Sequence, residues 1–435
     1  MTAQVPHILV VGGGYVGMYT AYGLRRAARK GKIRVTVVDP RSVMTYQPFL
    51  PEAAAGSVEP RHVVVPLRKT LKGCRVVTGR VTGIDHAHKV AKVLPEEGPA
   101  YELAYDQVVV ALGSIARTLP IPGLAEEAAG FKNVEEAIAL RNKVLDRLDV
   151  ASSQPDPALR KAALTFVFVG GGYAGVEAFA ELEDMARYAT RYYDNIQPSD
   201  MRWVLVEATN RILPEVGPDL GKYTVDQLRK RNMDIKLETR LESCEKGRVV
   251  LSDGEEFDAD TIVWTAGVKA NPALAGTDFP LDERGRVKCL PNLRIEGVDD
   301  AWSAGDNAAV PDLTAEPGVF CAPNAQHAVR QAHQLAANIL RTVDGKTPTD
   351  YKHKYVGSVA SLGLHKGVAQ LFGIKIKGWP AWFVHRSYHV SRVPTFNRKA
   401  RVVLDWTLAL FFRREVTSLG TLQAPREEFR RATQS

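Results

Sequence analysis

Two glycine runs of the same form stand 158 residues apart, from Gly12 to Gly170, in the 435-residue chain. Each run follows a short apolar segment, His7–Val11 or Phe166–Val169, and has the spacing Gly-x-Gly-x-x-Gly. In such a turn the first glycine permits a tight bend, the second lets the backbone approach a pyrophosphate, and the third lets helix and strand pack closely. The helix that follows offers free N–H groups and the positive end of its dipole to the phosphates. The residues predicted to form the two turns are Gly12, Gly14, Tyr15, Val16 and Gly17 in the first copy, and Gly170, Gly172, Tyr173 and Gly175 in the second.

An acidic residue ends the next apolar segment in both copies, Asp39 after Val35–Val38 and Glu207 after Trp203–Val206. A carboxylate at this place accepts hydrogen bonds from the ribose hydroxyls and repels a 2'-phosphate, so Glu207 favours NADH over NADPH. The interval from Gly175 to Glu207 exceeds the usual spacing of about 20 residues, because residues 188–200 look inserted. The alternative is an α/β fold with glycine punctuation and no ligand, which two complete copies make the weaker interpretation.

The order strand, glycine turn, helix, strand, acid therefore occurs twice, and it predicts an α/β protein with two Rossmann-like dinucleotide-binding domains. Two further buried-type strands, Gln107–Val110 and Thr261–Trp264, end in glycine turns that we interpret as domain junctions. The predicted domains are 1–115 with 271–345 for the first nucleotide, 116–270 for the second, and a C-terminal domain at 346–435. Residues at the junctions predicted to touch the nucleotides are Ala111, Gly113 and Gly267.

The segment Ala301–Ala308 contains Gly305-Asp306 at the end of an apolar strand. A glycine there brings the backbone close to a pyrophosphate, and the Asp306 carboxylate can bind a ribityl hydroxyl. The following helix, expected from Asn324 to about Leu340, would point its N-terminus at the pyrimidine edge of a flavin, where negative charge collects on reduction. The first site is therefore predicted to bind FAD and the second NADH.

With these motifs the chain resembles the flavoproteins with two dinucleotide-binding domains, and among them the type II, non-electrogenic NADH:quinone oxidoreductases. The matching segments are Gly12–Gly17, Tyr46–Leu50, Gly170–Glu177, Val206-Glu207 with Arg211–Pro214, Gly305-Asp306 and Ala325–Ala328. The resemblance implies that Glu177 lies on the nicotinamide side and that Gln326 lies on the quinone side and contacts FAD. A solvated helix residue is the equally weighted alternative for Glu177. The chain departs from the family pattern Ala-Gln-x-Ala-x-Gln at Arg330, because its second glutamine comes one residue later, about 100° around the helix.

The four cysteines, Cys74, Cys244, Cys289 and Cys321, stand far apart, with no metal-ligand spacing, so we predict no metal site. Related disulfide reductases carry a cysteine pair just after the first nucleotide-binding unit, but residues 41–60 contain no cysteine here. Reduced flavin is therefore expected to pass electrons directly to the acceptor. A redox role for Cys321 is the minor alternative.

The C-terminal residues 351–435 hold fifteen Lys and Arg against four Asp and Glu, whereas the first 350 residues hold 42 against 45. The aromatic segment Trp379–Val390 and the apolar segment Asn397–Glu415 stand among basic residues, Arg398, Lys399, Arg401, Arg413 and Arg414. This pattern predicts amphipathic helices that dock on an anionic membrane surface, as the resemblance also implies. Asp405 argues mildly against deep insertion. The alternatives are a core or dimer-interface helix; no nucleic-acid motif accompanies the charge.

No apolar run is long enough to span a bilayer, and no basic segment or cleavage site precedes the first strand, so we expect a peripheral protein on the cytoplasmic face of the plasma membrane. The predicted function is that of an FAD-dependent NADH:quinone oxidoreductase that pumps no protons, with catalytic residues Glu177, Gln326 and Arg330. One alternative is a soluble NADH-dependent reductase of another acceptor, whose tail would form a homodimer. Another is a flavin-bearing redox sensor that binds a partner. The proton donor is left open between Glu177, water and a histidine such as His327.

Overall fold

The computed structural model describes residues 5–353, 357–412, 414–418 and 430. Contacts divide the chain into two compact units, unit 1 with residues 1–45, 65–115 and 268–355, and unit 2 with residues 46–64, 116–267 and 356–435. Residues 46–64 thus group with the second nucleotide-binding fold rather than the first. The described residues from 357 onward also group with unit 2 by their contacts.

Unit 1 is built on a seven-stranded sheet whose centre is made of near-continuous apolar strands. The parallel strands, in spatial order, are β20 (Ala301–Ser303), β8 (Gln107–Val110), β1 (His7–Val11), β2 (Arg34–Asp39) and β5 (Arg75–Asp85). The antiparallel strands β6 (Val90–Pro95) and β7 (Tyr101–Ala104) complete the sheet. Every residue of β1 and β8 is buried, as expected for parallel strands covered on both faces.

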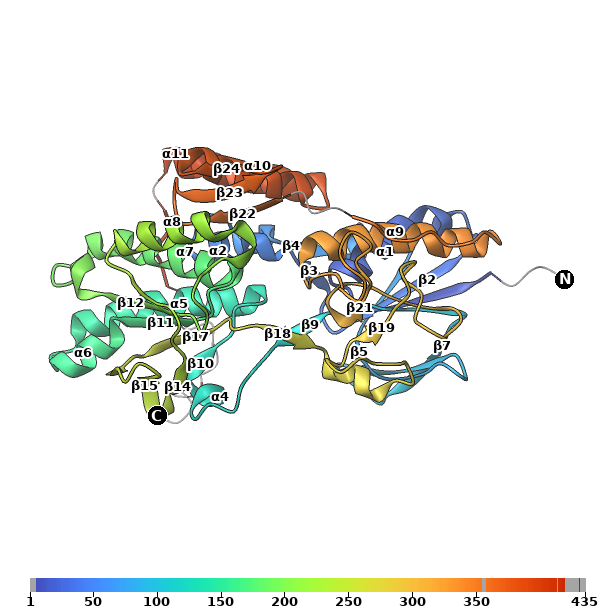
Figure 1. Ribbon diagram of the computed structural model, residues 1–435, viewed down its shortest axis with the longest axis horizontal. Helices are drawn as coiled ribbons and strands as arrows, with labels where there is room; N and C mark the ends of the chain where they lie inside the picture. Colours follow the sequence, from blue (N-terminus) through green and yellow to red (C-terminus); the bar gives the residue numbers. More distant parts are fainter. Residues whose placement is uncertain (1–4, 354–356, 413, 419–429, 431–435) are drawn as a thin grey trace. The chain divides into compact units, whose positions relative to one another are not determined.

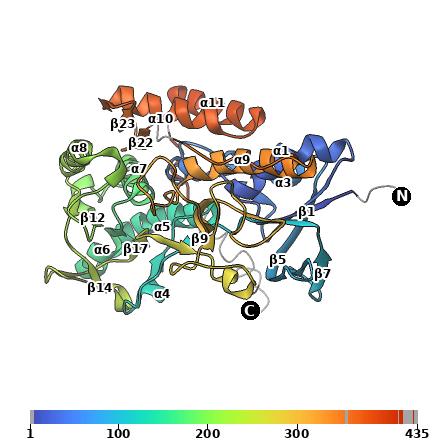
Figure 2. The same cartoon turned by 45° about the vertical axis from the view of Figure 1, so that its right-hand side comes forward.

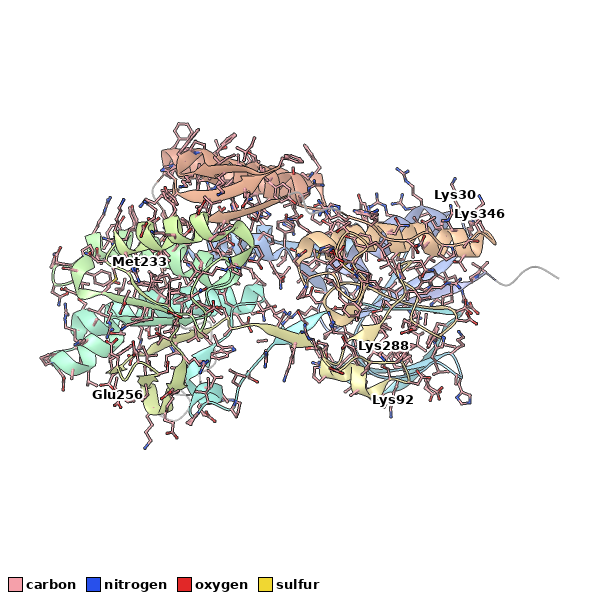
Figure 3. All side chains as sticks on the ribbon, in the orientation of Figure 1. Lys30, Lys92, Met233, Glu256, Lys288 and Lys346 are labelled. Atoms are coloured by element: carbon pink, nitrogen blue, oxygen red, sulfur yellow. The ribbon has the colours of Figure 1, made fainter. Side chains whose placement is uncertain are left out.

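Two long helices, α1 (Tyr15–Arg29) and α9 (Ala325–Val343), lie side by side in unit 1 (Figure 1). A Cβ on Gly23 of α1 would come 2.7 Å from the Cβ of Ala336, so the missing side chain lets the helices approach closely. Lys32, just after α1, pairs with Asp344 at the end of α9. Figure 3 accordingly shows Lys30 and Lys346 at the same end of the unit.

Unit 2 has a five-stranded parallel sheet in the order β10 (Ala128–Ala129), β17 (Thr261–Trp264), β11 (Thr165–Val169), β12 (Arg202–Val206) and β13 (Asp234–Lys236). The helices α5 (Val134–Ser153), α7 (Tyr173–Ala189) and α8 (Pro218–Arg229) belong to the same unit. An antiparallel meander of β14 (Leu241–Ser243), β15 (Arg248–Leu251) and β16 (Glu256–Asp258) shares an apolar core with the sheet. The two nucleotide-binding folds that the sequence predicts are therefore confirmed, and β8 and β17 have the predicted bounds.

The C-terminal part of unit 2 consists of a β-meander, β22 (Gly357–Ser361), β23 (Gly367–Leu371) and β24 (Ile374–Lys377), followed by α10 (Trp379–Arg392) and α11 (Phe396–Phe411). The meander lies over α7 and α8 in both views (Figures 1 and 2). The amphipathic segment expected at 397–415 is helical only to Phe411, and Arg413 lies outside the described residues. Within the described part of the chain, no helix has both the length and the apolar character to cross a membrane.

Buried ion pairs and hydrogen bonds attach this C-terminal part to α2 (Leu50–Ala54) of the same unit. Glu52, only 1% exposed, accepts a hydrogen bond of 2.7 Å from Trp406 Nε1, and its Oε2 lies 2.9 Å from Arg386 Nη2. A buried carboxylate is tolerated when such partners compensate its charge.

Asp405 of α11 faces the protein and not solvent. Its Oδ2 accepts a hydrogen bond of 3.1 Å from the Glu59 backbone and lies 2.6 Å from His62 Nδ1. Asp405 thus has partners within the protein, although the sequence places it within the apolar stretch of the helix.

A further buried carboxylate, Glu181 of α7, predicts a pH dependence of stability. Burial and the nearby Glu52 raise its pKa to about 6, from about 4.5 for an ordinary glutamate. The folded protein therefore binds a proton that the unfolded chain releases, so stability falls as pH rises from about 4.5 to about 6 and then stays level. We expect wild type to lose about 2 kcal/mol more than Glu181→Gln between pH 4 and pH 7 in urea unfolding. An identical pH response of the two proteins would contradict this assignment.

Candidate functional site

The first glycine turn joins β1 to α1 and is shaped by close backbone contact. A Cβ on Gly17 would overlap the carbonyl oxygen of Gly12, so any side chain would push α1 away from β1. Nothing lies within 4 Å of the position of a Cβ on Gly14, which leaves open space at the start of the helix. Because the first N–H groups of a helix have no partner within the helix, this opening suits a phosphate. Tyr15 and Val16 are the first residues of α1.

The second turn, between β11 and α7, repeats this geometry. A Cβ on Gly175 would overlap the carbonyl oxygen of Gly170, and nothing lies within 4 Å of one on Gly172. Gly170 has φ +115°, as Gly12 has φ +103°, so the same left-handed backbone opens both turns. Tyr173 is the first residue of α7. Both units therefore offer the same opening for a pyrophosphate.

The two acidic residues hold their turns through the same hydrogen bond. Asp39 Oδ2 accepts from the Gly13 N–H at 2.6 Å, and Glu207 Oε2 accepts from the Gly171 N–H at 2.6 Å. Burial raises the pKa of Asp39 above its ordinary value, while the Gly13 hydrogen bond opposes that shift. A carboxylate accepts several hydrogen bonds, so each acid retains capacity for ribose hydroxyls.

The long interval before Glu207 does not displace it. The additional residues extend α7 to Ala189 and form the 3₁₀ turns Thr190–Tyr192 and Pro198–Asp200, after which β12 begins at Arg202. The predicted insertion thus lies between α7 and β12 and leaves Glu207 at the end of its strand.

The ends of β8 and β20 in unit 1 are joined through Asn307. Its Oδ1 accepts from the Gly113 N–H at 3.0 Å, and its Nδ2 donates to the Val110 carbonyl at 3.1 Å. Next to it, Ser114 Oγ donates to Asp306 Oδ2 at 2.7 Å. Sequence reasoning missed Asn307, although its place directly after Gly305-Asp306 was a usable signal.

The helix that follows Gly305-Asp306 along the chain does not begin at this turn but near Asn324, as expected. The chain forms a 3₁₀ turn, Gly305–Asn307, and a short strand β21 (Ala308–Ala309), and α9 begins only at Ala325. Gly305 has φ +75°, and its N–H donates to Gln331 Oε1 at 2.7 Å. The turn is therefore positioned by a side chain of α9, and Gln331, which departs from the family pattern, has a structural partner.

Gln326 and Arg330 lie one turn apart on α9, and the structure brings them together. Arg330 Nη1 donates to Gln326 Oε1 at 3.3 Å and to the Gln326 carbonyl at 3.2 Å. The neighbouring His327 is buried, its Nδ1 lies 3.0 Å from Tyr351 Oη, and burial lowers its pKa below the ordinary value. His327 is therefore uncharged at neutral pH.

The remaining junction residues lie at strand ends. Ala111 follows β8, and its carbonyl oxygen is the atom that a Cβ on Gly12 would meet. Gly267 follows β17 in unit 2 with φ +88° and is exposed. Each residue is thus beside the glycine turn of its own unit.

Glu177, one turn into α7, is buried rather than solvated. Its Oε1 accepts a hydrogen bond of 2.8 Å from the Ser361 backbone and lies 3.0 Å from His385 Nε2. The alternative of a solvated helix residue is therefore wrong. The contact with α10 was not visible in the sequence, because the partners are more than 180 residues apart.

The cysteines give no support for a thiol in electron transfer. All four are free, and burial raises the pKa of the Cys321 thiol to about 11, so this group is not a thiolate at neutral pH. No group of three or more His, Cys, Asp or Glu among the described residues could hold a metal ion.

Duplicated glycine turns and their acids define a protein with two dinucleotide-binding folds, and comparisons with known proteins agree. Residues 6–332 match the model of the pyridine nucleotide-disulphide oxidoreductases. The chain is 32% identical over 387 residues to a type II NADH:quinone oxidoreductase of Staphylococcus aureus, covering 87% of this chain and 93% of that protein. It is 28% identical over 429 residues to one of Mycobacterium tuberculosis, covering 94% and 89%.

A solved structure has the same fold. NDH2 of Plasmodium falciparum in complex with NADH is similar with a TM-score of 0.88 at 18% identity, over 95% of this chain and all of that one. The chain belongs to the pyridine nucleotide-disulphide oxidoreductase family, and within it to the type II NADH:quinone oxidoreductases.

Alanine substitutions at the two equivalent third glycines test the separate roles of the turns. Gly17→Ala should give protein that fails to retain FAD, because the added methyl displaces the start of α1. Gly175→Ala should retain FAD and lose NADH affinity by at least about tenfold, or about 1.4 kcal/mol. Flavin absorbance after gel filtration and NADH titration by fluorescence provide the measurements. Flavin loss in Gly175→Ala alone would reverse the assignment of the two sites.

Proposed function

We propose that the protein is an FAD-dependent NADH:quinone oxidoreductase in which unit 1 binds FAD and unit 2 binds NADH. The observation that supports this most directly is the duplicated turn, with Asp39 and Glu207 making the same hydrogen bond in both units. The Gly305-Asp306 turn, present in unit 1, favours the flavin there. The family relatives are named for the same activity.

On the NADH side, Gly172 leaves room for the pyrophosphate and Glu207 accepts the ribose hydroxyls. Its carboxylate disfavours the 2'-phosphate of NADPH. Glu177 lies one turn along the same helix, at the place implied for the nicotinamide side. FAD, when bound, accepts a hydride equivalent from NADH and passes two electrons to an acceptor. The protein accelerates that transfer mainly by holding the two rings in alignment.

On the acceptor side, no cysteine occurs in residues 41–60, and the Cys321 thiol is buried and protonated. Electrons therefore pass to the acceptor without a disulfide. Gln326 and Arg330 form a polar pair at the start of α9 that can donate hydrogen bonds to a quinone carbonyl.

A large apolar surface on α10 and α11 supports attachment to a membrane. Its exposed members are Trp379, Phe383, Phe396, Val403, Leu404, Leu408, Leu410, Phe411 and Phe412. Monomeric proteins rarely expose so many large apolar side chains together. The basic residues Arg398, Lys399 and Arg401 on the same helix would meet anionic head groups. The protein would thus act as a peripheral enzyme on the cytoplasmic face of the plasma membrane.

Charged substitutions on this surface test membrane docking. Leu404 and Leu408 are 58% and 54% exposed, so Leu404→Glu with Leu408→Glu should fold normally and lose most binding to vesicles that contain anionic lipid. The matched control is Leu159→Glu on α6 (Pro157–Ala163), where the leucine is 56% exposed. Cosedimentation with vesicles gives the measurement. If the double variant bound vesicles as wild type does, this surface would not be the membrane-docking surface. If wild type formed a dimer that the variant lost, the surface would be a subunit interface instead.

Acceptor specificity tests the reaction itself. Purified holoprotein should oxidise NADH with a short-chain quinone for many turnovers under anaerobic conditions, and NADPH should be at least about tenfold less effective in kcat/KM. Glu207→Ala should weaken that preference, because the repulsive charge is removed. A single turnover per flavin would indicate a redox sensor. Turnover confined to another acceptor would indicate a different reductase.

A further inference from the structure

The guanidinium of Arg330 on α9 is half-buried and bonds to a neutral residue. Its Nη1 donates to the Gln326 carbonyl at 3.2 Å and to Gln326 Oε1 at 3.3 Å. Among the residues that the structure describes, no acceptor bonds to its Nε or Nη2, and no carboxylate forms an ion pair with it. A guanidinium has five N–H donors in one plane, so the edge formed by Nε and Nη2 is available for a ligand.

The titratable groups close to Arg330 are mostly uncharged at neutral pH. Burial lowers the pKa of His327, and Asp312 opposes that shift while Arg330 adds to it. Burial and Arg330 likewise lower the pKa of His353. Burial raises the pKa of the Tyr351 hydroxyl above its ordinary value. Arg330 therefore carries the positive charge of this group, and Asp312 acts on the histidines beside it.

Arg330 lies on a different face of α9 from the residues that pack against the predicted flavin-binding turn. The Cβ of Ala328 lies 3.6 Å from the position of a Cβ on Gly305, and Gln331 Oε1 accepts the Gly305 N–H. Arg330 follows Ala328 by about 200° around the helix and precedes Gln331 by about 100°. Its free edge is thus within one helical turn of the flavin contact and is not used by it.

A planar anion with two adjacent oxygens fits this free edge. Nε and Nη2 can donate two parallel hydrogen bonds, which match a flat group whose neighbouring oxygens share a negative charge. Among quinones, the deprotonated 2-hydroxy-1,4-quinones have such a group, because their C2 oxygen and C1 carbonyl lie side by side in the ring plane. A neutral quinone offers no charge to the guanidinium. The glutamine of the family pattern at this position would supply no charge to the anion.

We propose that Arg330 makes the acceptor site selective for acidic hydroxyquinones, which bind as anions to the free edge of its guanidinium. This inference rests on the proposed function, because it names the class of quinone that the same site reduces. The reaction is NADH + H⁺ + hydroxyquinone anion → NAD⁺ + hydroxyquinol anion. The C4–H bond of NADH breaks, and an O–H bond forms at each of the two quinone carbonyl oxygens. NADH supplies the electron pair and one hydrogen, and solvent supplies one proton.

Two matched quinones separate recognition of charge from general binding. At neutral pH 2-hydroxy-1,4-naphthoquinone is an anion, whereas 2-methoxy-1,4-naphthoquinone has the same ring without the charge. Binding of each to the oxidised holoprotein, without NADH, is measured by the change in flavin absorbance, and kcat/KM is then measured with each. We expect Arg330→Gln to lower the ratio of the affinities for the anionic and the neutral quinone by at least about tenfold. Arg330→Lys keeps the charge without the fork and should give an intermediate ratio.

The control is Arg341→Gln near the end of the same helix, where the guanidinium donates to the Thr347 carbonyl at 2.7 Å. It should leave the ratio at the wild-type value. Affinities for the two quinones that change by the same factor in Arg330→Gln, or that do not change, would overturn the selectivity. If Arg330→Gln does not retain flavin, the same comparison in Arg330→Lys decides the matter. Wild-type holoprotein that NADH reduces but that passes electrons to neither quinone would instead refute the proposed function.

Discussion

The structure depends on one close contact, made twice, between the start of a helix and the strand before it. At Gly17 and at Gly175 the helix backbone passes so near the preceding glycine carbonyl that no side chain fits between them. This contact keeps the open side of each turn, at Gly14 and Gly172, at the helix N-terminus. A phosphate can then bind backbone N–H groups directly, and the acid at the end of the next strand fixes the turn.

The same turn leads to different surroundings in the two units. In unit 1 it is accompanied by a hydrogen-bonded polar set, in which Asn307 joins two strand ends and Gln331 positions Gly305. In unit 2 the helix after the turn carries buried carboxylates at Glu177 and Glu181. Buried carboxylates need compensating partners, and His385, Ser361 and Arg414 from the C-terminal part of the chain provide them. The C-terminal part of the chain, which carries the exposed apolar residues, thus also compensates the negative charge of the buried carboxylates on α7, beside the predicted NADH site.

Local sequence patterns predicted the strands and glycine turns whose conformation depends on residues close to them in the chain. The apolar runs predicted the bounds that β1, β8 and β17 have in the structure, because parallel strands covered on both faces require continuous apolar residues. Glu207 was identified at the end of its strand despite its long spacing from Gly175, because the apolar strand β12 before it is recognisable in the sequence. The helix expected from Asn324 is present as α9, whereas the 3₁₀ turn at Gly305 could not be predicted, because Gln331 of that distant helix holds it. The orientation of Asp405 and the burial of Glu177 could not be predicted, because their partners come from distant parts of the chain.

The central claim is that one unit holds a flavin that NADH in the other unit reduces. Anaerobic titration of the purified yellow protein with NADH tests this most directly. The flavin absorbance should bleach with about one NADH per flavin, and a short-chain quinone added afterwards should restore it. Protein that is colourless, that stays yellow with excess NADH, or that bleaches and is not reoxidised by the quinone would contradict the account.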